Sequence, residues 1–114
     1  MVELTFDEAY ATESGDYFQL HFGNDDSSTS DSQLYFLIQR SFEDDKDTSY
    51  YIETNAEEMI NHYDITQATL SKNYLYLNTT NSKYTEFKIV FKSTQRSFNQ
   101  VERIFRVMFK GIPS

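Results

Sequence analysis

Hydrophobic and polar residues alternate along most of this chain, a pattern typical of strands with one buried face. Val2–Phe6 alternates in this way, and Tyr17–Phe22 does so again after a turn at Glu13–Asp16. We expect these two segments to pair as the first hairpin of an antiparallel sheet. Gly23–Ser32, which follows, contains only small, polar and acidic residues. It predicts a loop that either connects two strands or contacts a partner.

The middle of the chain predicts the central hairpin of the sheet. Leu34–Ile38 is an unbroken apolar run, which indicates a strand covered on both faces. The charged segment Glu43–Asp47 comes next, and Tyr50–Ile52 begins a second β-rich run. Tyr50 has the same phase as Ile52 and is expected in the core. An apolar strand, an acidic turn and a return strand together predict a hairpin that presents four carboxylates to solvent.

A short helical segment and three more strands are predicted after the hairpin. Thr54 and Glu57 stand at the spacing of a capping box, which favours one or two helical turns ending near Ile60. The alternating pattern then resumes in three segments, which are Ile65–Leu70, Tyr74–Leu77 and Glu86–Phe91.

The period changes from two to 3.6 near the C-terminus, which predicts an amphipathic helix over about residues 94–110. The helix begins either at a capping box formed by Ser97–Gln100 or one turn earlier, at Ser93 or Thr94. Gly111 and Pro113 end it. The predicted fold is therefore α+β and mostly β. A meandering antiparallel sheet of six or seven strands spans residues 2–92, one C-terminal helix packs on one face, and residues 1–114 form a single domain.

The charge is negative overall and unevenly distributed. The formal net charge is -8; residues 1–58 hold 15 acids and 2 bases, and residues 59–114 hold 3 acids and 8 bases. This balance argues against direct binding to nucleic acid or to an anionic membrane, and it is compatible with docking onto a basic protein surface. The N-terminal segment is acidic and no apolar stretch is long enough to span a bilayer, so we expect a cytoplasmic protein.

The residue types needed for catalysis or metal binding do not form a recognisable pattern. Cysteine is absent, the three glycines are isolated, and His21 and His62 have no motif around them, which favours surface histidines. The acidic cluster Glu43–Asp47 lacks the spacing of a calcium loop and contains Lys46. We therefore expect no enzymatic activity, no cofactor and no metal site.

Three segments of the central region form a recognisable series, which are Phe36–Arg40, Glu43–Asp47 and Tyr50–Glu53. This series resembles the immunity protein 10 family of bacterial polymorphic toxin systems, and a weaker likeness covers roughly residues 16–92. Asn55–Tyr63 departs from the family pattern because it contains no glycine.

The resemblance implies a mostly β protein that neutralises a cognate toxin in the cytoplasm by direct contact. We expect the acidic hairpin tip to bind in a basic cleft of the toxin. Tyrosine side chains are favoured at protein interfaces of this kind. The expected contact residues are Glu43, Asp44, Asp45 and Asp47, together with Arg40, Glu53 and Tyr51. The alternative is a small structural or self-associating protein, in which the acidic half of one copy meets the basic helix of another to form a dimer.

Overall fold

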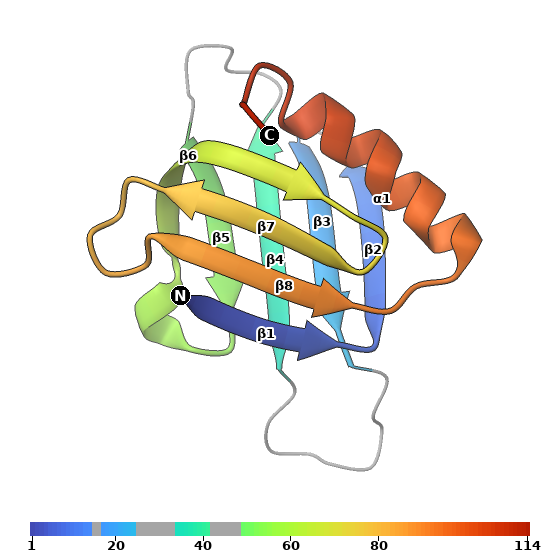
Figure 1. Cartoon of the computed structure of the whole chain (residues 1–114), viewed down its shortest axis with the longest axis horizontal. Coiled ribbons are helices and arrows are strands. Elements are labelled where there is room, and N and C mark those ends of the chain that lie inside the picture. The colour runs from blue at the N-terminus through green and yellow to red at the C-terminus, as the bar shows by residue number, and fades with distance from the viewer. Residues whose placement is uncertain (15–16, 25–33, 42–48) are drawn as a thin grey trace.

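The computed structural model describes residues 1–14, 17–24, 34–41 and 49–114 (Figure 1). Within these ranges the chain forms eight strands, one 3-10 turn (η1) and one α-helix. In chain order they are β1 (Val2–Phe6), β2 (Glu8–Ser14), β3 (Tyr17–Gly23), β4 (Tyr35–Ser41), β5 (Ser49–Thr54), η1 (Glu57–Met59), β6 (Asn61–Leu70), β7 (Tyr74–Thr79), β8 (Glu86–Phe91) and α1 (Gln95–Met108).

The strands form one open, mixed sheet in the order β1-β8-β7-β6-β5-β4-β3-β2. Neighbours are antiparallel except β1 and β8, which are parallel. The sheet folds over on itself, so that β1, β8 and β7 lie across β2, β3, β4 and β5 (Figure 1). We call the first group the front layer and the second group the back layer. The mostly β class with one C-terminal helix is as predicted.

The two layers are joined at two corners. At one corner Asn61–Asp64 of β6 pairs with β5, the following residues pair with β7, and the register shifts between Ile65 and Gln67. At the other corner β1 runs into β2 through Asp7, whose amide donates hydrogen bonds to the carbonyl oxygen of Gly23 (3.2 Å) and to Oδ1 of Asn24 (3.0 Å). Such bends let one strand serve both layers.

The core between the layers is rich in phenylalanine. Phe22 of the back layer lies 5.1 Å from Phe91 of the front layer, and Phe36 lies 5.7 Å from Phe87, between ring centroids. All four side chains are buried. Each contributes about 1.5–3 kcal/mol when withdrawn from water, which explains why these alternating positions fix the inward face of each strand.

Helix α1 covers the part of the back layer that the front layer leaves open. It contacts β2 and β3, and it buries Phe98, Val101, Ile104 and Met108 in the same core. The helix is capped by Thr94, whose hydroxyl accepts a hydrogen bond from the amide of Ser97 (3.1 Å), so the earlier of the two predicted starts is the one adopted. The front layer and α1 therefore lie on the same side of the back layer (Figure 1).

The predicted first hairpin is wrong. Val2–Phe6 pairs with β8, and the partner of β3 is β2, a strand that the sequence did not predict. The inward positions of β2 include Ala9, which is buried, and Ala11, which packs against the core beneath α1. Because alanine gives a weak hydrophobic signal, the alternation in this strand is hard to recognise.

Two other local predictions are corrected. In β4, Phe36 and Ile38 are buried but Tyr35 is only half-buried, so this strand is not covered equally on both faces. The capping box at Thr54 does not form, because β5 continues to Thr54 and its hydroxyl accepts a hydrogen bond from the amide of Ala56 (3.0 Å). A single 3-10 turn follows. Among the described residues, α1 is neither long nor apolar enough to cross a bilayer.

Candidate functional site

The outer face of the back layer carries six side chains that contact one another in series from β2 to β6. Each comes from the outward phase of its strand, and together they cross five neighbouring strands. We call this set the aromatic strip, which consists of Tyr10, His21, Tyr35, Glu53, Tyr51 and His62.

A carboxylate held by two tyrosines forms the centre of the strip. The Tyr35 hydroxyl donates a hydrogen bond of 2.8 Å to Oε2 of Glu53, and the Tyr51 hydroxyl donates one of 2.6 Å to Oε1. These hydrogen bonds favour the ionised carboxylate and lower the pKa of Glu53. Both oxygens of Glu53 are thus fixed in position, and the carboxylate is charged at neutral pH.

The two tyrosines are correspondingly hard to ionise. Desolvation, followed by the hydrogen bond to Glu53, raises the pKa of Tyr35 to about 12. The hydrogen bond to Glu53 is the main cause that raises the pKa of Tyr51. Both phenols therefore remain protonated donors throughout the neutral range.

A histidine extends the strip on each side of this centre. The His21 ring stacks on Tyr35 with 6.1 Å between centroids and 14° between planes, and Tyr10 lies 6.2 Å away on its other side. His62 lies 5.4 Å from Tyr51 across the β5–β6 pair. Burial lowers the pKa of His21, an effect that the charge of Glu8 partly opposes. His21 is therefore mostly neutral at pH 7.

A glycine makes room for the stack of His21 on Tyr35. Gly23 is the residue directly opposite Tyr35 in the β3–β4 ladder, and it is buried. A Cβ atom placed on Gly23 would lie 3.2 Å from Cε1 of His21. A ring that lies over a strand glycine in this way is a known means of covering exposed backbone. The geometry of the strip thus depends on a residue that has no side chain.

The strip combines ring faces with one fixed negative charge. Tyr10 is 45% exposed, His62 is exposed, and the central side chains are half-buried. Half-buried tyrosines offer a large contact area at a small cost in conformational entropy, and they are enriched at protein interfaces. Such a face is suited to contact with another protein.

The sequence-predicted site residues fall into three groups. Tyr51 and Glu53 belong to the strip. Arg40 lies on β4 in the inward phase, where Nη1 donates hydrogen bonds to the carbonyl oxygen of Met108 (2.8 Å) and to the Tyr50 hydroxyl (3.1 Å). The structure thus gives Arg40 an internal role, and a partner contact for it stays a prediction. The remaining residues, Glu43, Asp44, Asp45 and Asp47, lie outside the described part of the chain, as do residues 25–32 of the predicted loop.

Four members of the strip were not predicted as site residues. Tyr10 and Tyr35 belong to no motif that predicts a site, and His21 and His62 were interpreted only as surface histidines. His62 lies in β6. The signal that identifies them is the pairing register, which places Tyr10 opposite His21 and Tyr51 opposite His62. Register between distant strands is not readable from a single sequence.

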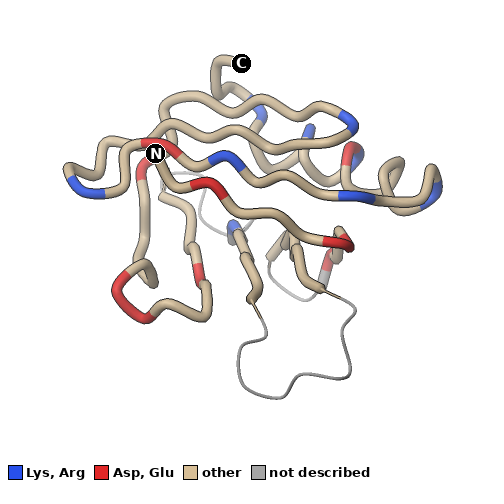
Figure 2. Tube along the Cα trace, turned by 60° about the horizontal axis from the view of Figure 1, so that its bottom comes forward, with Lys and Arg blue, Asp and Glu red and all other residues tan. Residues whose placement is uncertain are grey.

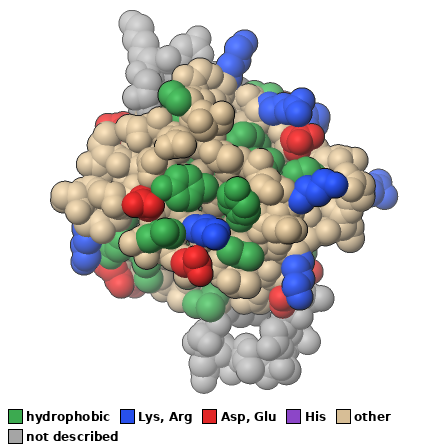
Figure 3. All heavy atoms as spheres, viewed as in Figure 1, with side chains coloured by type: hydrophobic (Ala, Val, Ile, Leu, Met, Phe, Trp, Pro, Cys, Tyr) green, Lys and Arg blue, Asp and Glu red, His purple; other side chains and the backbone are tan. Residues whose placement is uncertain are grey.

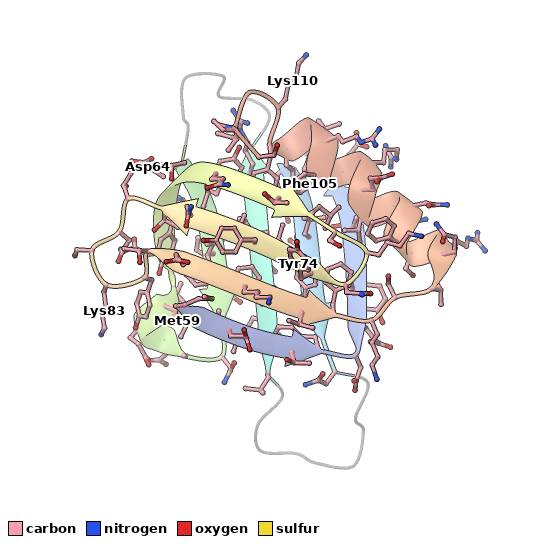
Figure 4. All side chains as sticks on the ribbon, in the orientation of Figure 1. Met59, Asp64, Tyr74, Lys83, Phe105 and Lys110 are labelled. Carbon is pink, nitrogen blue, oxygen red and sulfur yellow. The ribbon has the colours of Figure 1, made fainter. Side chains whose placement is uncertain are left out.

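The outer face of the front layer carries a second, smaller group of tyrosines (Figures 3 and 4). The Tyr76 hydroxyl donates hydrogen bonds to Glu86 (2.7 Å) and to Asn78 (3.1 Å), and the Lys88 ammonium lies 5.5 Å from the ring of Tyr74. Tyr74, Tyr76 and Lys88 border a shallow hollow of about 340 Å³. Glu86 accepts a hydrogen bond from one tyrosine, whereas Glu53 accepts hydrogen bonds from two, so Glu86 is a suitable control for experiments on the strip.

Within the described ranges, no three acidic or histidine side chains come close enough together to hold a metal ion. Comparison with protein-family models and with curated proteins finds no match to this chain.

Proposed function

We propose that this chain is an immunity protein, which binds and neutralises a cognate bacterial toxin by protein–protein contact. The observation that carries the proposal is the aromatic strip, in which half-buried rings and one fixed carboxylate lie on the outer face of the back layer. This face points away from α1 and the front layer. Surfaces with this composition are energetically favourable sites for a protein partner.

The proposal agrees with the location of the family resemblance. The segments Phe36–Arg40 and Tyr50–Glu53, which carry that resemblance, form most of β4 and β5. These two strands also provide the centre of the strip, Tyr35, Glu53 and Tyr51. The resemblance and the surface chemistry therefore point to the same hairpin.

The acidic hairpin tip extends the proposed contact surface. Residues 42–48 connect β4 to β5, so Glu43, Asp44, Asp45 and Asp47 belong to the same hairpin as Tyr51 and Glu53. In this proposal the tip charges steer a basic toxin surface toward the strip, and the rings supply the close contact. Electrostatic steering mainly raises the association rate and weakens as salt is added.

The test uses the product of the neighbouring open reading frame as the candidate toxin. Binding is measured by surface plasmon resonance, and neutralisation by survival of cells that express both proteins. Tyr51→Ala should increase the dissociation rate, and reversal of the four tip carboxylates to lysine should lower the association rate. Tyr76→Ala, on the front layer, should change neither rate. Absence of binding by the unmodified chain, or unchanged rates in both variants, would contradict the proposal.

A specific feature of α1 favours a second candidate function, self-association. Basic residues occur along the helix and just beyond it (Figure 2). They are exposed, and they are Arg96, Arg103, Arg106 and Lys110. The acidic half of a second copy could meet these residues and form a dimer. Light scattering at about 0.05 and 0.5 M salt distinguishes the two functions, because a charge-driven dimer dissociates as the Debye length shortens.

A further inference from the structure

We infer that the centre of the aromatic strip is a receptor for one arginine side chain of the protein partner. The inference rests on the proposed function and specifies the chemistry of its contact. It assigns Glu53 as the acceptor of the guanidinium, and Tyr35 and Tyr51 as the rings beside which the guanidinium lies.

The first argument is the hydrogen-bonding capacity that remains on Glu53. Each of its oxygens accepts one tyrosine hydrogen bond, Oε2 from Tyr35 and Oε1 from Tyr51. A carboxylate has about four lone-pair positions, so both oxygens can still accept a donor. Two fixed oxygens with free lone pairs match the parallel N–H groups of a guanidinium, which binds carboxylates in a bidentate manner.

The second argument is that the charge of Glu53 has no cationic partner among the described residues. The ion pairs between described residues join Arg103 to Glu13 and Arg106 to Glu102, each at 3.7 Å. Arg40, although its strand is next to β5, points to the other side of the sheet and binds Met108. An ionised carboxylate that lacks a cation within its own chain is complementary to a cation from a partner.

The third argument is the ring surface around the carboxylate. The planar guanidinium stacks on aromatic faces, whereas the ammonium of lysine acts as a point charge. This chain already shows the arrangement on its inner side, where the Arg40 guanidinium lies 5.3 Å from the centroid of the Tyr50 ring. Burial lowers the pKa of His21, so at pH 7 its ring places no strong positive charge beside Tyr35. The strip therefore favours arginine over lysine.

The experiment is an NMR titration of the ¹⁵N-labelled full chain with N-acetyl-argininamide. We expect saturable shifts of the amide signals of Tyr35, Tyr51 and Glu53. The matched lysine amide should bind about tenfold more weakly, and the uncharged citrulline amide should cause no saturable shift. Equal binding of the lysine or citrulline amide, or shifts that appear elsewhere on the chain, would overturn the inference.

Three variants assign the site. Glu53→Gln keeps the shape of the side chain and removes its charge, and it should weaken binding of the probe about tenfold. Tyr35→Phe keeps the ring and releases one carboxylate oxygen, and it should give an intermediate loss. Glu86→Gln removes a similar charge from the front layer and should have no effect. Amide spectra confirm that each variant is folded. Unchanged binding in Glu53→Gln would overturn the inference.

The inference and the proposed function can fail separately. If Tyr51→Ala weakens toxin binding while N-acetyl-argininamide leaves the strip unperturbed, the arginine receptor is wrong and the immunity function stands. If the probe binds at Glu53 but the unmodified chain binds no toxin, the receptor stands as a property of the chain and the proposed function is wrong.

Discussion

The guanidinium of Arg40 on β4 donates a hydrogen bond of 2.8 Å to the carbonyl oxygen of Met108, the last residue of α1. The Tyr50 hydroxyl donates a second one, of 2.6 Å, to the same oxygen. The last carbonyl groups of a helix have no partner within the helix, and a cation near them also complements the helix dipole. The ring of Phe109 stacks on Tyr50 at 4.8 Å and completes the attachment of the helix end to the sheet.

Removal of this attachment should destabilise the protein without affecting the strip. We expect Arg40→Ala to lower the free energy of unfolding by about 2 kcal/mol, because a partly buried, charge-assisted hydrogen bond is lost. The measurement is urea unfolding followed by circular dichroism. The control is Arg96→Ala at an exposed helix position, which should stay within about 0.5 kcal/mol of the unmodified protein. Equal stability of the two variants would contradict the structural role of Arg40.

The ionisation of Glu53 should make stability depend on pH. Its pKa in the folded protein lies below that of the unfolded chain, so the unfolded state takes up a proton first as the pH falls. The stabilisation from the ionised carboxylate is therefore complete above the unfolded pKa of about 4.5 and is lost as the pH falls through the folded pKa. Urea unfolding between about pH 7 and pH 3 should show a steeper loss for the unmodified protein than for Glu53→Gln. Parallel curves would show that the two tyrosine hydrogen bonds do not stabilise the anion.

Gly23→Ala tests the steric requirement beneath the stack of His21 on Tyr35. The backbone of Gly23 is not in the left-handed region, so the effect comes from the new Cβ atom, 3.2 Å from the His21 ring. We expect a loss of about 1 kcal/mol from overpacking and a displaced His21 ring. Two-dimensional NMR of the histidine ring protons measures the displacement through the change in ring-current shift. Unaltered His21 signals would mean that the stack tolerates a methyl group at Gly23.

Gly111→Ala tests a different property, the backbone conformation after α1. Gly111 has φ of 89°, and a Cβ atom there would meet no atom within 4 Å. The cost is therefore conformational alone, and we expect a decrease of about 1 kcal/mol in the free energy of unfolding. Gly111→Asn is the matched comparison, because asparagine tolerates this region better and should lose less. Thermal unfolding of both variants provides the measurement.

The parts of the fold that could be predicted are those with large side chains in a local pattern. Local sequence is enough to recognise the alternation in Tyr17–Phe22 and Glu86–Phe91, and also the helical period of the C-terminal segment. Each of these patterns predicts the observed element. Strand β2 was not predicted, because its inward positions Ala9 and Ala11 are small. Its absence from the prediction led to the wrong partner for Val2–Phe6.

The candidate site was predictable only in part, because it depends on distant pairing. Tyr51 and Glu53 lie two residues apart on one strand, so their common face follows from the sequence. The contacts of His21 with Tyr35 and with Tyr10 depend on how β2, β3 and β4 align. No local rule provides this alignment.

The parallel pairing of β1 with β8 has a consequence for the order in which the chain folds. The first strand emerges early during synthesis but has no place in the sheet until the last strand has been made. Contacts between such distant segments require closure of a long loop, which slows folding. Strands β2 to β7 can assemble as successive antiparallel neighbours, whereas the ribosome must release β8 before β1 finds its position. Completion of the front layer should therefore be a late step in folding.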